Sequence, residues 1–169
     1  MTDKQEYSGA ALNSFILALG HSKGVLHKIL TEAGVDHIDP ERWYDFDWAR
    51  SIYFKIAAQV GRGAITEVGR SMIATAEFPP GIDGVASLLT SLDAAYRLNA
   101  RGPGIGDITC VIEDEHTASL IWTTQFPCAL NIGIMEGACS RYGASALIEH
   151  GAGGCVSEGG PSCSYHVSW

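Results

Sequence analysis

Four of the five cysteines lie between positions 128 and 163, and they are the residues with the most chemical potential. Cys155 and Cys163 are eight positions apart across a glycine-rich stretch, and Cys128 precedes them. Three thiolates and one nitrogen or oxygen donor form a closed tetrahedral zinc site. His150 is the nearest candidate for the fourth ligand, and Glu158 is another. The spacing is not that of a compact zinc finger, but it permits a structural zinc.

The competing interpretation is that these cysteines only pack in the core. A free cysteine usually behaves as a small buried hydrophobe, and this reading applies to Cys128 and Cys163. Cys110 and Cys139 fall on apolar faces of their segments and are expected in the core. The polar start of the sequence has no features of a secretory signal, which favours a cytoplasmic location. Five cysteines in a reducing compartment are thiols or metal ligands rather than disulfides.

The elements that position these residues differ on the two sides of a glycine-rich segment at 101–106. After a short tail at 1–8, the apolar residues follow helical spacing, and after 106 the spacing alternates with a period of two. Helices are predicted at 9–19, 25–34, 64–77, 83–99 and 128–142, and a further helix within 43–60 is capped by Asp45 or Asp47 and runs to Val60. Strands are predicted at 107–113, 117–125, 145–151 and 163–169. Gly133 and Gly137 would leave a smooth strip on the last helix, where the sheet or another helix can approach closely.

This order predicts an α+β fold: N-terminal helices packed on an antiparallel sheet of about four strands, with a helix between two hairpins. At 169 residues the chain is expected to be a single domain, with a helical part at about 9–100 and a sheet part at about 106–169. The helices and sheet are expected to enclose an apolar cavity. The residues predicted to line a ligand pocket are Trp43, Tyr53, Phe78, Trp122, Phe126, Ile132 and His150. Pockets of this kind are mostly apolar with a few polar groups, although ordinary core packing explains any single aromatic residue.

Composition excludes several classes of function. The net charge of −8 argues against binding to nucleic acid or to anionic membrane surfaces, which both reward clustered Lys and Arg. No apolar run approaches the ~20 residues of a membrane span. The sequence contains no Gly-x-Ser-x-Gly elbow and no phosphate-binding loop, so no catalytic residues are predicted.

The C-terminal pattern resembles the 4-vinyl reductase-like domain. The residues that carry the resemblance are Cys128, the helix with Gly133 and Gly137, Cys155, and the final Gly-Gly-Pro-Ser-Cys-Ser-Tyr-His-Val-Ser-Trp. The likeness extends over residues 106–169, and only the order of elements agrees before them. The family belongs to a superfamily shared with haem-based nitric-oxide sensors and with TRAPP vesicle-tethering subunits. The resemblance implies an α+β fold with a hydrophobic cavity between helices and sheet.

In phenol-sensing transcription activators, such a domain binds an aromatic effector and carries a structural zinc. The resemblance implies that Cys128, Cys155 and Cys163 occupy three of the four ligand positions. The fourth position is a glutamate in those proteins and is Ala152 here. His150, Glu158 or water would complete the site, or the zinc has been lost; alternatively, His150 touches the ligand. The haem sensors use a proximal histidine with a Tyr-x-Ser-x-Arg motif, which is absent here, so haem is expected to be unlikely.

The sequence therefore predicts a sensory domain, rather than an enzyme, that binds a small hydrophobic or aromatic molecule. A homodimer and a signalling partner protein are expected. The alternatives are an enzyme or enzyme accessory that acts on tetrapyrroles, and a scaffold subunit that acts by protein contact alone.

Overall fold

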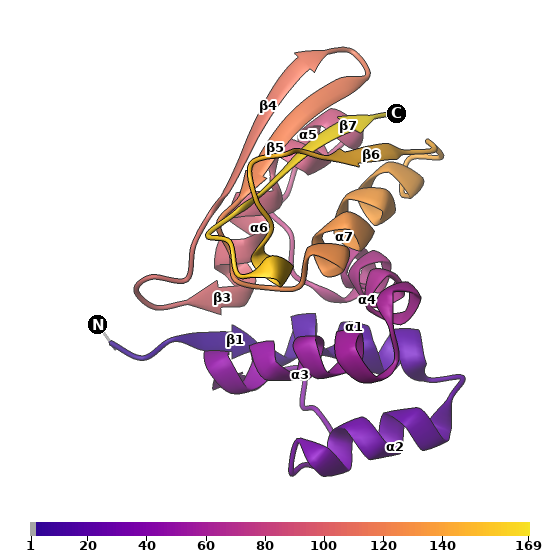
Figure 1. Ribbon diagram of the computed structural model, residues 1–169, viewed down its shortest axis with the longest axis vertical. Helices are drawn as coiled ribbons and strands as arrows, with labels where there is room; N and C mark the ends of the chain where they lie inside the picture. The colour runs from indigo at the N-terminus through magenta and orange to yellow at the C-terminus, as the bar shows by residue number, and fades with distance from the viewer. Residues whose placement is uncertain (1–2) are drawn as a thin grey trace.

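The computed structural model describes residues 3–169 and confirms the α+β class (Figure 1). The helices are α1 (Gly9–Leu19), α2 (Lys23–Glu32), α3 (Phe46–Gln59), α4 (Arg62–Thr75), α5 (Val85–Thr90), α6 (Leu92–Asn99) and α7 (Cys128–Ser140), with a 3-10 turn η1 (Val156–Glu158). The strands are β1 (Glu6–Ser8), β2 (Trp43–Asp45), β3 (Ala100–Arg101), β4 (Ile108–Asp114), β5 (Thr117–Trp122), β6 (Leu147–His150) and β7 (Cys163–Ser168). Helices α1 to α3 form one end of the molecule, the larger sheet forms the other, and α4 and α7 lie between them (Figure 1).

The larger sheet contains the four strands predicted from alternation. Its order is β4-β5-β7-β6, and all neighbouring strands are antiparallel. The side chains of Leu120 and Tyr165 face the helices and are buried, whereas Val111 and Ile121 face outward. Helix α7 connects the β4–β5 hairpin to the β6–β7 hairpin, as predicted.

A second, three-stranded sheet in the order β2-β1-β3 was not predicted. The expected tail at 1–8 is wrong for Glu6–Ser8, which form the central strand, while residues 1–2 lie outside the described residues. Of the two predicted caps, Asp45 is the one that caps α3: it accepts a hydrogen bond from the Trp48 amide at 2.9 Å, and the helix begins at Phe46. The helix predicted at 83–99 is divided at Ser91 into α5 and α6.

Helices α4 and α7 pack with their backbones in contact. A Cβ atom added to Gly133 would lie 2.0 Å from the carbonyl oxygen of Thr66, and one added to Gly69 would lie 2.3 Å from that of Leu130. The smooth strip predicted at Gly133 and Gly137 is therefore the contact surface for another helix, α4. This contact fixes the axis of α7 and with it the position of Cys128 at its first turn.

No helix in the described part of the chain combines the length and the apolar character needed to cross a bilayer.

Candidate metal centre and cavity

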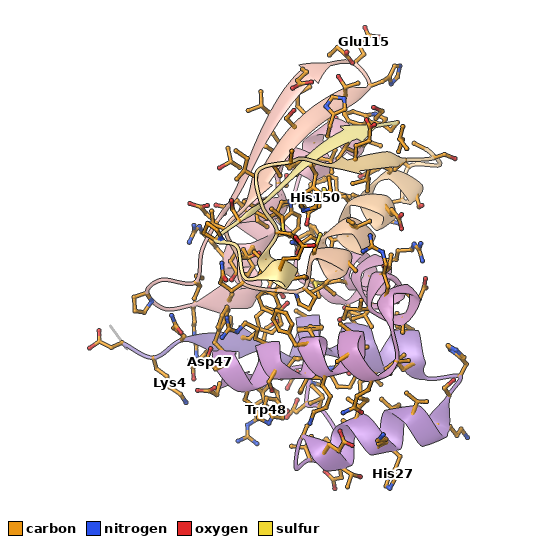
Figure 2. The ribbon with its side chains drawn as sticks, in the orientation of Figure 1. Lys4, His27, Asp47, Trp48, Glu115 and His150 are labelled. Carbon is orange, nitrogen blue, oxygen red and sulfur yellow. The ribbon has the colours of Figure 1, made fainter. Side chains whose placement is uncertain are left out.

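Three cysteines and one histidine come together where helix α7 meets the β6–β7 hairpin. The ligand atoms of Cys128, His150, Cys155 and Cys163 all lie within 4.8 Å of one another. Cys128 begins α7, His150 ends β6, Cys155 precedes η1, and Cys163 begins β7. In Figure 2, His150 lies between the hairpin and α7, whereas His27 and Glu115 lie at opposite ends of the molecule. All four metal ligands predicted from the sequence are therefore in one cluster.

The spacing of the sulfur atoms matches the geometry of a tetrahedral metal site. The Sγ atoms of Cys155 and Cys163 are 3.8 Å apart, and neither is in a disulfide. Two sulfurs that are each ~2.3 Å from a zinc ion, at the tetrahedral angle, are about 3.8 Å apart. Glu158 is not in the cluster of described residues, so the fourth donor on this geometry is His150.

The atoms around the cluster orient its ligands. His150 Nδ1 lies 2.6 Å from the carbonyl oxygen of Gly151, which can only accept, so Nδ1 carries the proton and Nε2 keeps its lone pair. Histidine ligands of metals commonly donate their second ring nitrogen in this way. The Val156 amide donates to Cys163 Sγ at 3.2 Å, and the Tyr165 hydroxyl donates to Cys128 Sγ at 3.1 Å. These donors place positive charge next to two of the sulfurs.

Burial controls the protonation of Cys128. It is the main cause that raises the pKa of this thiol to about 12; the neighbouring Cys163 and Cys155 act in the same direction, and the Tyr165 hydroxyl acts against it. Burial likewise raises the pKa of the Tyr165 hydroxyl far above its usual value. Without a cation Cys128 is therefore a neutral thiol at physiological pH. A bound divalent ion would displace this proton.

An apolar cavity that is partly open to solvent lies between the helices and β4–β5. Its volume is about 50 Å³. It is lined by Tyr7, Ala11, Met72, Ala76, Phe78, Leu92, Ala95, Tyr96, Asn99, Ile108, Trp122, Thr124, Phe126, Leu130, Asn131 and Ile134. Phe126 is at the centre of an aromatic cluster and contacts Tyr7, Phe46, Tyr53 and Tyr96.

The predicted pocket residues are divided among several places. Phe78, Trp122 and Phe126 line the apolar cavity. Ile132 and His150 line a separate, open groove beside the cysteine cluster. Tyr53 is fully buried in the core. Trp43 lies on β2, and the Cζ atom of Arg101 is 4.0 Å from the centre of the Trp43 ring.

Sequence reasoning placed Trp122 in the pocket but missed Thr124 and Asn131, which also line the cavity. The side chains of Trp122, Thr124 and Asn131 are 3%, 1% and 1% exposed, and each has a polar atom without a hydrogen-bond partner in the described residues. The alternation in β5 placed Trp122 on the inward face. It gave no sign that its indole N–H would lack an acceptor there, because that depends on the surrounding elements.

Asn131 connects the cavity to the cysteine cluster. Its Nδ2 donates to the Tyr165 hydroxyl at 3.3 Å, and that hydroxyl donates to Cys128 Sγ. The Oδ1 atom of the same amide is unpartnered. The two sites are thus separated by two side chains.

No family model and no curated protein matches this chain. Solved structures that are similar include one from work on haem distortion in the H-NOX family, with a TM-score of 0.73, 16% identity and coverage of 96% of this chain and 94% of that one. An H-NOX protein from S. oneidensis in the Fe(II)NO ligation state has a TM-score of 0.67 and 13% identity, with 95% and 98% covered. An oxygen-binding H-NOX domain related to soluble guanylate cyclases has a TM-score of 0.66 and 15% identity, with 95% and 91% covered.

These likenesses show that the chain has the H-NOX fold. This is the α+β fold that the sequence resemblance implied; the 4-vinyl reductase-like assignment stays a prediction. The expectation that haem is unlikely is wrong, since the solved structures that share this fold include haem proteins. The missing motif was too narrow a criterion, because it describes one way of holding haem.

A haem group needs a side chain that binds its iron and a cavity large enough for the porphyrin. The lining of the apolar cavity includes Tyr7, Tyr96 and Met72, which are residue types that bind haem iron in some proteins, and no histidine among the described residues. Its volume of about 50 Å³ is far below the ~300–1,000 Å³ of typical ligand pockets. A porphyrin does not fit this cavity in the conformation described.

Proposed function

We propose that this chain is a sensory domain that binds a small molecule and is held together by a structural zinc ion. The observation that carries the proposal is the convergence of four donor atoms, from Cys128, His150, Cys155 and Cys163, within 4.8 Å of one another. Core packing alone does not explain why the sulfur atoms of three cysteines lie close to a histidine nitrogen. The fold shared with the H-NOX domains supports the sensory part.

Zinc is the metal that best suits these donors. Three sulfurs and one imidazole nitrogen are a ligand set of structural zinc sites, whereas Mg²⁺ and Ca²⁺ prefer oxygen. Four protein ligands leave no open position for a substrate, so the ion would be structural rather than catalytic. Because binding displaces the proton of Cys128, the affinity for zinc would rise with pH.

The ion would join elements that otherwise have few contacts. The 151–162 segment is largely exposed and includes Gly153 and Gly154, around which an added Cβ would meet nothing within 4 Å. Ligands in this segment and at both of its flanks would tie it to the first turn of α7. A structural zinc can supply folding free energy in this way.

The tetrapyrrole enzyme and the protein-contact scaffold differ from the sensor in what they bind. An enzyme would turn over a tetrapyrrole, and a scaffold would bind no small molecule at all. The homodimer and the signalling partner expected from the sequence stay proposals. A mass measurement by light scattering tests the first.

Metal analysis of untagged protein tests the zinc site. We expect about one zinc per chain in the wild type and a loss of most of it in Cys155→Ser, because that variant removes one of three sulfur ligands. Cys110→Ser is the matched control, since Cys110 is a free cysteine outside the cluster, and it should keep its zinc. Zinc-free wild-type protein that stays folded and does not take up added zinc would disprove the site.

A further inference from the structure

We propose that the apolar cavity binds a small uncharged alcohol, whose hydroxyl group is held by Trp122, Thr124 and Asn131. This inference deepens the sensory function proposed above and rests on it. It begins from the buried polar atoms that have no partner in the described part of the chain. They are Thr75 Oγ1, Trp122 Nε1, Thr124 Oγ1 and Asn131 Oδ1.

Three of these four atoms belong to residues that line the apolar cavity, namely Trp122, Thr124 and Asn131. Buried polar groups in native proteins are nearly always hydrogen-bonded, so an unpartnered one indicates a strained site or a missing partner. Asn99 lines the same cavity and shows the ordinary situation. Its amide donates to the carbonyl oxygens of Glu77 and Ala95 and accepts from the Ser8 hydroxyl. Unpartnered atoms on three neighbouring lining residues therefore indicate a partner that occupies the cavity.

The types of the three atoms define the group that would satisfy them. The Trp122 indole N–H can only donate, the Asn131 Oδ1 atom can only accept, and the Thr124 hydroxyl can do either. The orientation of the Asn131 amide is set by its Nδ2 atom, which donates to Tyr165. A hydroxyl group accepts and donates at once, so it can bind the indole and the amide together. A carbonyl or an ether would leave Asn131 Oδ1 without a donor.

The remaining lining defines the rest of the ligand. It contains no Asp, Glu, Lys, Arg or His among the described residues, so a charged molecule would be buried without a counter-ion. Phe78, Phe126, Leu130 and Ile134 offer apolar contact. The volume of about 50 Å³ is a third of the ~150 Å³ cavity that holds benzene in an engineered protein. One water needs about 10–15 Å³ in this measure, so the space holds roughly four heavy atoms, which suits a short aliphatic alcohol rather than an aromatic ring.

The test is a titration of the metal-loaded full chain with 1-propanol, followed by the indole N–H signals in nitrogen–proton NMR spectra. We expect one indole signal, the one that disappears in Trp122→Phe, to shift with saturation. Thr124→Val removes the hydroxyl at nearly constant shape and should weaken binding roughly tenfold, the loss of one hydrogen bond. Trp43→Phe, on the surface away from the cavity, should leave the affinity unchanged. Propionate and propylammonium, which match in size but carry charge, should not bind.

Other outcomes would overturn the alcohol assignment. A shift that does not saturate, with the same response in Thr124→Val, would mean that the cavity holds only ordered water. Binding of phenol or hemin but not of 1-propanol would also overturn it, while leaving the sensory function in place. No binding of any of these molecules to a chain that retains its zinc would reject the sensory function and keep the metal site.

Discussion

At the scale of single residues, Tyr165 has the most consequential position. It is buried on the inward face of β7, and its hydroxyl donates to Cys128 Sγ at 3.1 Å. A donor of this kind stabilises a thiolate and holds its sulfur in place for a metal. The hydroxyl also accepts from Asn131, and the Cys128 carbonyl oxygen is a second, more distant acceptor for its proton at 3.4 Å.

Tyr165→Phe tests the role of this hydroxyl. We expect zinc affinity to fall by roughly 10- to 100-fold, as for other residues that orient a metal ligand. Competition with a chelator of known affinity measures the change. Tyr142→Phe is the control, because the Tyr142 hydroxyl is exposed and donates only to the Ile82 carbonyl oxygen. Equal zinc affinity in the two variants would contradict the assignment.

The residues of the metal site could be anticipated from sequence, and those of the cavity only in part. Residue type alone identified the candidate ligands, because few residue types bind zinc; they are Cys128, Cys155, Cys163 and His150. Asn131 did not, since an asparagine on the first turns of a helix is usually a surface residue. Its burial follows from the packing of α7 against the sheet, which no local pattern encodes.

At the scale of elements, the contact between α4 and α7 positions both sites. Helix α7 carries Cys128 at its start and Asn131 on its first turn, and its backbone lies directly against α4 at Gly69 and Gly133. Alternation and helical spacing predicted the main elements around this pair. They missed β1, β2 and β3, because strands of two or three residues are too short to show a period.

Gly133→Ala tests this packing. The added methyl group would lie 2.0 Å from the Thr66 carbonyl oxygen, so the two helices must separate. We expect a loss of about 1–3 kcal/mol in the free energy of unfolding, as for other overpacked cores, measured by urea denaturation.

Gly63→Ala provides the matched comparison on α4. A Cβ atom there meets nothing within 4 Å, so the substitution should stabilise the helix by about 0.5–1 kcal/mol. If both alanine variants had the same stability, the backbone contact at Gly133 would not be limiting.

At the scale of the whole molecule, the two ends are expected to respond differently to loss of metal. The core of the end formed by α1 to α3 includes Phe15 and Ile52, which are buried and far from the cysteines in sequence. The 151–162 segment depends on the cluster at its flanks.

Removal of metal with a chelator should therefore loosen one part of the molecule first. We expect faster amide hydrogen exchange in β6, the 151–162 segment and the start of α7, with α1 and α4 still protected. Mass spectrometry of exchanged peptides measures this, and re-addition of zinc should restore the original rates. Uniform loss of protection over both ends would show instead that the metal is needed for the entire fold.

The Asn131–Tyr165 pair has a consequence for how the two sites can act on each other. Thermodynamic reciprocity requires that any factor by which a cavity ligand changes the affinity for the metal is also the factor by which the metal changes the affinity for that ligand. A molecule that attracts the Asn131 amide toward the cavity would lengthen its bond to Tyr165 and alter the donor at Cys128. The same two side chains would therefore link the two proposed sites, so that the affinity for the cavity ligand would depend on whether the metal is bound.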